Sequence, residues 1–191
     1  MQKAVFLDRD GVINRLVFNP DTGEYESPHN VEDLELFPWA VPSLRVLREM
    51  EYMLFLISNQ PSYAKGKTPM ENIRAIHETL HRIFLEHGID FAEYYYCYHH
   101  PNGIVPDLTG VCRCRKPGIF FLEEAKKNFD FSITDSWLIG DQDSDILCGQ
   151  SFGLKTILIK DQHSFKKRGE SSPDFQAADI EEAVQIIKGV V

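Results

Sequence analysis

The 191-residue sequence has no apolar run that approaches the roughly 20 residues a membrane-spanning helix needs. Its start also lacks the pattern of a secretory signal peptide, because Met1-Gln2-Lys3 leads into only a short apolar run before Asp8. Repeats, low-complexity tracts and linkers rich in Gly or Ser are absent as well. From these absences we expect one cytoplasmic domain over residues 1–191 that does not use a membrane as a partner.

The sequence also lacks an excess of basic residues. It has 20 Lys and Arg residues against 29 Asp and Glu residues, a formal net charge of −9 at pH 7. Binding of nucleic acid calls for a basic surface, so nucleic acid is not an expected partner. A small phosphorylated metabolite remains compatible with this charge, because a bound divalent cation reverses the local field. Basic residues do cluster at Arg113, Arg115 and Lys116.

Short apolar segments alternate with amphipathic ones along most of the chain. This pattern predicts strands at 4–7, 53–57, 93–98, 137–139 and 156–159, and helices at 38–50, 70–86, 117–128, 144–152 and 180–188. The alternation predicts parallel strands with helices on both faces, a doubly wound, Rossmann-like α/β domain. Two long segments do not fit it, and long loops in compact domains are usually functional. We expect residues 15–37 to form a flap and residues 97–116 a metal-binding loop.

Polar residues follow three of the predicted strands. Asp8, Ser58-Asn59 and Gly140-Asp141 all stand at carboxyl ends, where ligands bind in sheets of this kind. An isolated Asp-x-Asp-Gly, as at Asp8 to Gly11, is better explained as a polar turn. A second acidic group at 141, 143 and 145 changes that interpretation, because converging carboxylates repel one another unless a cation neutralises them. A hard, oxygen-binding ion such as Mg²⁺ is the simplest solution.

Cysteine is scarce but unevenly placed. Three of the four cysteines lie within eighteen residues together with two histidines, which favours a metal site over disulfides in a cytosolic chain. Three thiolates and one imidazole make a closed tetrahedral set for structural Zn²⁺. The expected ligands are Cys97, His99, Cys112 and Cys114. The spacing favours His99, His100 remains an alternative, and a pair of unrelated buried thiols is the competing explanation.

Four segments resemble, in order, the motifs of the haloacid-dehalogenase-like (HAD) phosphatases. They are Phe6-Leu7-Asp8-Arg9-Asp10-Gly11-Val12-Ile13-Asn14, Ser58-Asn59-Gln60, Arg115-Lys116-Pro117 and Gly140-Asp141 with Asp145. The resemblance runs from residue 4 to about residue 160. It implies a HAD-like fold without a large cap domain, and hence an open site and monomeric action on a small substrate.

The resemblance also implies a role for each motif. Asp8 would be the nucleophile that forms an aspartyl-phosphate, and Asp10 the general acid and base. Mg²⁺ would be bound by the carboxylates of Asp8 and Asp141 and by the backbone carbonyl of Asp10. The residues expected to bind phosphate or substrate are Ser58, Asn59, Arg115 and Lys116. Asp145 would orient Lys116 or a metal-bound water, whereas Asp143 has no role in the family and is interpreted as a solvated residue at a helix N-terminus.

The segment around the cysteines narrows the resemblance. Cys97-Tyr98-His99-His100-Pro101 and Cys112-Arg113-Cys114-Arg115-Lys116-Pro117 look like the zinc loop shared by D,D-heptose 1,7-bisphosphate phosphatases and histidinol-phosphate phosphatases. The function this implies is Mg²⁺-dependent hydrolysis of a sugar phosphate, with a heptose bisphosphate first. The alternatives are a histidinol-phosphate phosphatase and a catalytically weak, zinc-stabilised binding domain of the same fold.

Three positions depart from the pattern of these phosphatases. Ser62 stands where Gly is usual, Lys65 where Arg is usual, and Gln142 where Lys or Arg usually follows the aspartate. The loss of a positive charge at Gln142 suggests a less charged substrate, which gives the hypothesis that a monophosphate is preferred to a bisphosphate.

Overall fold

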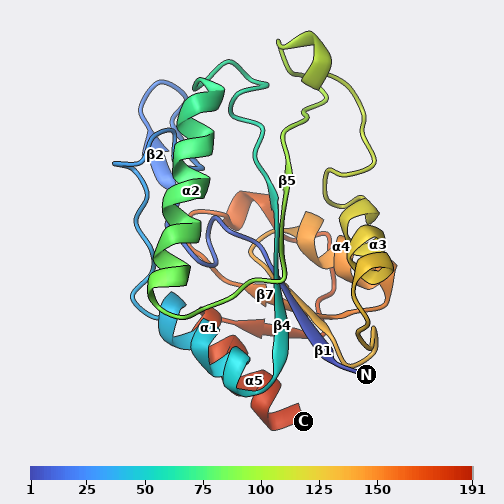
Figure 1. Ribbon diagram of the computed structural model, residues 1–191. Coiled ribbons are helices and arrows are strands. Elements are labelled where there is room, and N and C mark those ends of the chain that lie inside the picture. The colour runs from blue at the N-terminus through green and yellow to red at the C-terminus, as the bar shows by residue number, and fades with distance from the viewer. Residues whose placement is uncertain (191) are drawn as a thin grey trace.

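The computed structural model describes residues 1–190, and its centre is a parallel sheet of six strands in the order β5-β4-β1-β6-β7-β8 (Figure 1). The strands are β1 (Lys3–Leu7), β4 (Tyr52–Asn59), β5 (Glu93–Cys97), β6 (Trp137–Gly140), β7 (Lys155–Ile159) and β8 (Phe175–Ala177). The helices are α1 (Ala40–Glu49), α2 (Met70–Glu86), α3 (Phe120–Asn128), α4 (Asp143–Phe152) and α5 (Ile180–Val190).

Helices cover both faces of this sheet. Val5 and Leu7 of β1 pack into the core formed with α1, α2 and α5, whereas Ala4 and Phe6 pack into the core formed with α3 and α4. Strands buried on both faces have nearly continuous apolar sequences, which is why β1 shows no alternation of polar residues. The predicted doubly wound α/β fold is confirmed. No helix in the described chain is long and apolar enough to cross a membrane.

The structure corrects the predicted start of α3. Pro117 was expected to open this helix, but the helix begins at Phe120. Residues 115–118 instead form a tight turn in which the backbone N–H of Gly118 donates to the carbonyl of Arg115 at 2.7 Å. A Cβ on Gly118 would collide with the Arg113 carbonyl, so this tight turn requires a glycine at position 118.

Two features of the fold were not predicted. Residues 15–37 contain an antiparallel hairpin of β2 (Val17–Asn19) and β3 (Glu24–Glu26), and β8 forms an edge of the main sheet. Each of these strands has three residues, too few for a recognisable alternation of side chains. The residues between β7 and β8 include a short 3₁₀ turn at Phe165–Lys167.

The register of the sheet determines where the polar residues lie. Leu7 of β1 pairs with Leu56 of β4 and with Ile139 of β6, so the carboxyl ends of these three strands lie side by side. Asp8 and Asp141, just after β1 and β6, and Ser58, near the end of β4, therefore meet at one edge of the sheet.

Candidate active site

A cavity of about 490 Å³ opens beyond the carboxyl ends of β1, β4 and β6. Its floor is formed by Asp8, Asp10, Lys116 and Asp145, and one wall by residues 22–27 of the hairpin. Other walls come from residues 61–67 after β4, from Arg115, and from Lys167 after β7. Loops from four parts of the chain thus enclose the predicted catalytic residues.

Lys116 lies at the centre of this floor. Its Nζ is 2.9 Å from Asp8 Oδ1 and 2.6 Å from Asp145 Oδ1, and it donates to the backbone carbonyl of Ile57 at 2.7 Å. The Lys116 and Asp145 side chains are almost wholly buried, with 2% and 1% exposed. The expectation that Asp145 orients Lys116 agrees with this contact.

Three buried carboxylates face this single ammonium group. Oxygens of Asp8, Asp141 and Asp145 lie within 4.8 Å of one another. Burial, and then the charges of Asp8 and Asp145, raise the pKa of Asp141 well above its usual value. Burial also raises the pKa of Asp145 to about 6, although the nearby Lys116 charge opposes that shift. The floor therefore carries more negative charge than its protein partners neutralise.

The donor set suits a hard divalent cation. Among residues 1–190, neither carboxylate oxygen of Asp141 has a hydrogen-bond partner, although both are buried. Buried carboxylates without partners are costly unless a cation binds them, and Mg²⁺ takes oxygen ligands of this kind. Gly11 makes room here, because a Cβ at this position would collide with the Asp141 carboxylate.

The Asp10 carboxylate is held by donors from several elements. It accepts hydrogen bonds from Arg9 Nη2 at 2.9 Å and Asn14 Nδ2 at 2.9 Å, on Oδ1, and from Gln60 Nε2 at 2.6 Å and Ser27 Oγ at 2.8 Å, on Oδ2. Burial raises the pKa of Asp10, but the Arg9 charge and these hydrogen bonds outweigh burial and lower it. Asp10 is thus fixed at the cavity floor as a carboxylate.

The two residues at the end of β4 differ in what their side chains do. Ser58 is 2% exposed, and its hydroxyl accepts a hydrogen bond from Gln60 Nε2 at 3.0 Å. The Asn59 side chain spans the backbone of Lys116, accepting from its N–H at 3.0 Å and donating to its carbonyl at 3.2 Å. The Asn59 amide thus holds the backbone of Lys116 at the floor and also lines the cavity, and its role in binding phosphate stays a prediction.

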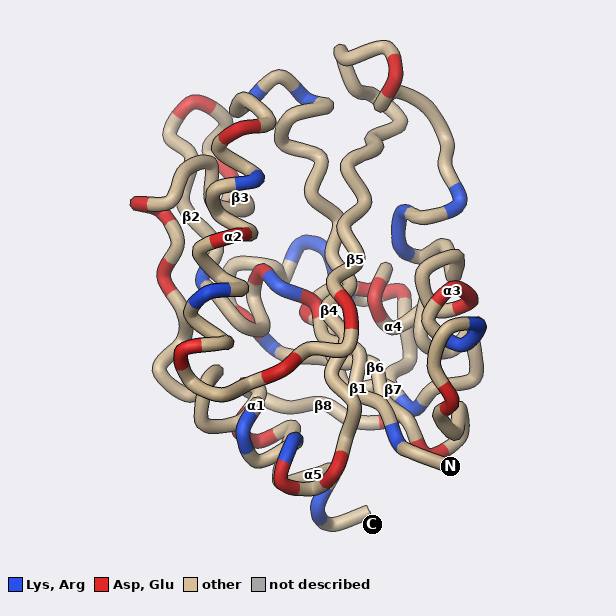
Figure 2. The backbone as a smooth tube through the Cα atoms, viewed as in Figure 1, with Lys and Arg blue, Asp and Glu red and all other residues tan. Residues whose placement is uncertain are grey.

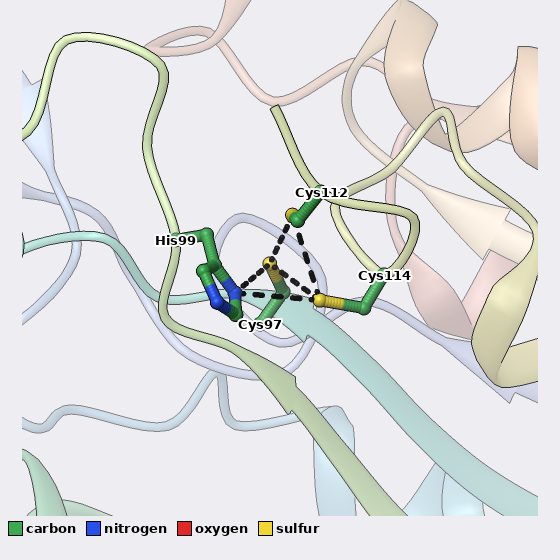
Figure 3. A group of neighbouring side chains, drawn as sticks. All are labelled: Cys97, His99, Cys112 and Cys114. Atoms are coloured by element: carbon green, nitrogen blue, oxygen red, sulfur yellow. Dashed lines mark hydrogen bonds between the residues drawn. The ribbon is translucent and has the colours of Figure 1, made fainter. Parts of the chain in front are cut away.

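The predicted cysteine cluster comes together. The Sγ atoms of Cys97, Cys112 and Cys114 lie 3.3 to 3.7 Å apart, and His99 Nδ1 lies 3.8 Å from Cys97 Sγ and 3.5 Å from Cys114 Sγ. Figure 3 shows these four side chains pointing at one another. Edges of roughly 3.8 Å follow from tetrahedral Zn–S bonds of about 2.3 Å, so the cluster fits zinc.

His100 is not part of this cluster. Its Nδ1 instead accepts a hydrogen bond from the backbone N–H of Asn102 at 3.1 Å. Of the two histidines left open by the sequence, the structure therefore places His99 with the cysteines. Cys114 is followed directly by Arg115, which donates to the His99 carbonyl at 3.2 Å and lines the cavity.

Asp143 is not the solvated residue that the sequence suggested. It is 8% exposed and accepts hydrogen bonds from the backbone N–H groups of Glu170 at 2.8 Å and Ser171 at 3.2 Å. The segment after the 3₁₀ turn folds over the N-terminus of α4 and buries this carboxylate. Asp143 thereby fastens that segment beside the cavity, a role that no local pattern indicated.

Several residues at the site were missed. Arg9 and Gln60 lie inside the quoted motifs, but only their neighbours were given roles. Lys67 and Lys167 line the cavity from segments far apart in the sequence, whereas Glu26 and Ser27, which also line it, lie in the predicted flap. No short sequence pattern marks these polar residues as neighbours. Only the fold brings them together.

The comparisons with known proteins agree with this geometry. The family model described as HAD-hydrolase-like matches residues 113–183. A D-glycero-alpha-D-manno-heptose-1,7-bisphosphate 7-phosphatase of Photorhabdus laumondii is 33% identical over 89% of each chain. The chain belongs to the HAD-like phosphatases. The predicted phosphoric monoester hydrolase is thus confirmed at the level of the family.

Two further relatives extend the likeness over nearly the whole chain. A D-glycero-D-manno-heptose-1,7-bisphosphate 7-phosphatase of Chlorobaculum tepidum is 33% identical over 95% of this chain and 92% of its own. The crystal structure of a D,D-heptose 1,7-bisphosphate phosphatase from B. bronchiseptica, complexed with magnesium and phosphate, shares the fold with a TM-score of 0.80. It is 20% identical, with 99% of each chain covered.

Proposed function

We propose that this HAD-like phosphatase hydrolyses a heptose bisphosphate, removing the 7-phosphate of D-glycero-D-manno-heptose 1,7-bisphosphate or of a closely related sugar. The observation that carries the proposal is the floor of the cavity, where Asp8 lies 2.9 Å from Lys116 Nζ beside Asp10. The buried Asp141 carboxylate lies within 4.8 Å of Asp8, beneath this floor. The names of the relatives that are 33% identical support the choice of sugar.

The residues of the floor suit a two-step transfer. In the first step a carboxylate oxygen of Asp8 bonds to phosphorus and the bond from phosphorus to the leaving oxygen breaks. Asp10 is a carboxylate in the substrate-free protein, so it must take up a proton when substrate binds, and it then gives this proton to the leaving oxygen. In the second step water attacks the same phosphorus, Asp10 takes a proton from this water, and the bond to Asp8 breaks. The Lys116 ammonium, with Ser58, stabilises the charge on the phosphoryl oxygens.

Mg²⁺ is the metal that we assign to the floor. Asp8 and Asp141 would hold it through carboxylate oxygens and Asp10 through its backbone carbonyl. When bound, Mg²⁺ would neutralise negative charge on the floor and on the phosphoryl group. The unpartnered oxygens of Asp141 support this assignment.

A second set of basic residues surrounds the cavity above the floor. Lys65, Lys67, Arg115 and Lys167 all line it. Burial, followed by the like charges of Lys67, Arg115 and Lys167, lowers the pKa of Lys65, which reflects how closely these groups are placed. Basic segments are visible in the loops above the sheet (Figure 2). Lys67 is already paired with Glu26, but Lys65, Arg115 and Lys167 still favour a second phosphate on the substrate. The monophosphate hypothesis that Gln142 suggested remains the competing prediction.

The decisive experiment measures phosphate release from a panel of substrates with and without Mg²⁺. The panel contains the heptose 1,7-bisphosphate, its 1-phosphate and 7-phosphate, and histidinol phosphate. We expect the bisphosphate to be the best substrate and Asp8→Asn to reduce kcat by about 10³-fold or more, because the nucleophile is lost. Asp130→Asn is the matched control, since the Asp130 side chain is 83% exposed.

Three outcomes would redirect the proposal. Hydrolysis that needs no Mg²⁺ and survives Asp8→Asn would contradict the mechanism. A preference for histidinol phosphate, or for a monophosphate, would replace the substrate. Absence of hydrolysis across the panel would favour the zinc-stabilised binding domain. Gel filtration with the same protein would test the expected monomer.

We also propose that Cys97, His99, Cys112 and Cys114 hold a structural Zn²⁺. With four protein ligands such a site is closed, and zinc would fix Arg115 and Lys116 at the cavity. Metal analysis of the purified protein should give about one zinc per chain. Cys112→Ser should lower that content, whereas Cys148→Ser should not, because Cys148 Sγ lies near the Gly118 carbonyl and outside the cluster.

A further inference from the structure

Gln60 is a buried side chain that joins three parts of the floor. It is 2% exposed, its Nε2 donates to Asp10 Oδ2 at 2.6 Å and to Ser58 Oγ at 3.0 Å, and its Oε1 accepts from Arg9 Nη2 at 2.9 Å. Both polar atoms of the Gln60 side chain thus make hydrogen bonds to residues at or beside the proposed catalytic site. Gln60 itself does not line the cavity.

These contacts fix the orientation of the Gln60 amide. Arg9 can only donate, so it requires the amide oxygen on its side. A flipped amide would place its NH₂ group against the Arg9 guanidinium and its oxygen against the Asp10 carboxylate. Neither contact is a hydrogen bond, and the second brings two acceptors together. The Gln60 NH₂ group therefore faces Asp10 and Ser58.

The backbone of Gln60 is anchored as firmly as its side chain. Its N–H donates to the carbonyl of Cys97 at 2.7 Å, at the end of β5. Arg9 is fully buried, and its Nη2 donates to Asp10 Oδ1 and Oδ2 at 2.9 and 3.1 Å as well as to Gln60 Oε1. Arg9 and Gln60, bonded to each other, both hold the Asp10 carboxylate, and Asn14 and Ser27 are its further donors.

We propose that Gln60 is a positioning residue for proton transfer, which aims the Asp10 carboxyl at the leaving oxygen and ties it to Ser58 at the phosphoryl group. This inference rests on the proposed two-step mechanism. Gln60 touches neither phosphorus nor the leaving group. It acts by keeping the carboxyl from rotating away, so the proton that leaves Asp10 reaches the leaving oxygen along a short, fixed path.

The dependence of rate on the leaving group tests this role. An alkyl phosphate needs its leaving oxygen protonated, whereas the p-nitrophenolate of p-nitrophenyl phosphate leaves without help. The measurement is the pre-steady-state release of each leaving group by Gln60→Met, which keeps the length of the side chain and removes its hydrogen bonds. We expect release from the alkyl phosphate to fall by about 10- to 100-fold, and from p-nitrophenyl phosphate by less than about 3-fold.

Three further variants serve as comparisons for Gln60→Met. Asp10→Asn should show the same selectivity with a larger loss, and Ser27→Ala the same selectivity with a smaller one. Ser136→Ala serves as the structural control, because the buried Ser136 hydroxyl bonds to the Ala4 N–H at 2.8 Å, far from the cavity in the fold. It should lower stability and leave the ratio of the two rates unchanged.

An equal loss on both substrates in Gln60→Met would overturn the proposal, and so would a gain on the alkyl phosphate. If Gln60→Met does not fold, Gln60→Glu replaces it, because Glu keeps the side-chain volume and the acceptor for Arg9. An equal loss of rate on both substrates in Gln60→Glu would again overturn the role. Neither substrate is a heptose, so the substrate panel with wild-type protein decides the proposed sugar separately.

Discussion

At the scale of single residues, Gly11 sets how closely the end of β1 approaches Asp141. Its φ is +81°, and an added Cβ would collide with the Asp141 carboxylate. Gly11→Ala should therefore cost about 1–2 kcal/mol in stability from backbone strain and displace a proposed metal ligand as well. We expect phosphatase activity to fall by about 10-fold or more at a fixed Mg²⁺ concentration, with the loss partly recovered at higher Mg²⁺. Steady-state kinetics across a Mg²⁺ titration measures this.

Gly88→Ala is the matched control for that variant. Gly88 follows α2 with a φ of +67°, and nothing lies within 4 Å of an added Cβ. The substitution should cost a similar free energy of unfolding and leave activity and Mg²⁺ dependence unchanged. If Gly11→Ala behaved in the same way, the close approach to Asp141 would not matter for the reaction.

The residue scale also shows why part of the site could be predicted and part could not. Asp8 and Asp141 stand directly after strands, so their convergence follows from the parallel sheet. Glu26 and Lys67 form an ion pair at the cavity wall from residues 41 positions apart. Their contact depends on how a hairpin and a loop fold over the sheet, and no short pattern encodes that.

At the scale of elements, α2 packs on the edge strand β5 through a stack of aromatic rings. His77 stacks on Tyr96 with ring centroids 3.6 Å apart, and His81 stacks on Tyr94 at the same distance. The hydroxyl of Tyr98 lies 3.3 Å from His77 Nδ1. Burial, and then the charges of Arg9 and His81, lower the pKa of His77 to about 3. A neutral imidazole is thus part of the contact between α2 and β5.

This stack predicts a loss of stability in acid. The pKa of His77 is near 6.5 when unfolded and about 3 when folded, so between these values the unfolded chain binds a proton that the fold excludes. Stability therefore falls as pH falls through this window, by about 1.4 kcal/mol per pH unit, and is unaffected above it. His77→Phe keeps the stack without the titration.

The measurement for this stack is denaturant unfolding at pH 8 and pH 5. Wild type should lose about 2 kcal/mol more than His77→Phe over this interval. The exposed His87, replaced by Phe, should retain the slope of wild type. Equal slopes for wild type and His77→Phe would show that the fold accepts the protonated ring.

The elements that were predicted share a physical property. Strands β1, β4 and β7 are apolar runs buried on both faces, and α2 was predicted at its observed bounds because its apolar residues recur at helical spacing. The three-residue strands β2, β3 and β8 carry too few side chains to show a period. The start of α3 was wrong because Pro117 suits both a first helical turn and the tight turn that the structure contains.

At the scale of the whole molecule, three of the 29 acidic side chains are buried together, where the fold tolerates negative charge least. Asp8, Asp141 and Asp145 are at most 5% exposed, and Lys116 is the cation that contacts this group in the described chain. Converging carboxylates in such a site oppose folding until a cation binds them. The fold is thus less stable than its core would allow, and part of its stability should depend on Mg²⁺.

Asp141→Asn separates these two effects, because it removes a buried charge and a proposed Mg²⁺ ligand together. Since burial and its acidic neighbours raise the pKa of Asp141, the neutral amide should stabilise the metal-free protein by about 1–3 kcal/mol. Mg²⁺ at 100 times its Kd should stabilise wild type by about 2.7 kcal/mol and so raise its Tm, and it should leave the Tm of Asp141→Asn nearly unchanged. Asp143→Asn is the control, because this buried carboxylate has hydrogen-bond partners. The substitution should lower stability and keep the response to Mg²⁺.

Thermal unfolding of the three proteins, with EDTA and then with Mg²⁺, measures both effects. A less stable Asp141→Asn that still responded to Mg²⁺ would show that the metal binds elsewhere and that Asp141 is held by the protein alone.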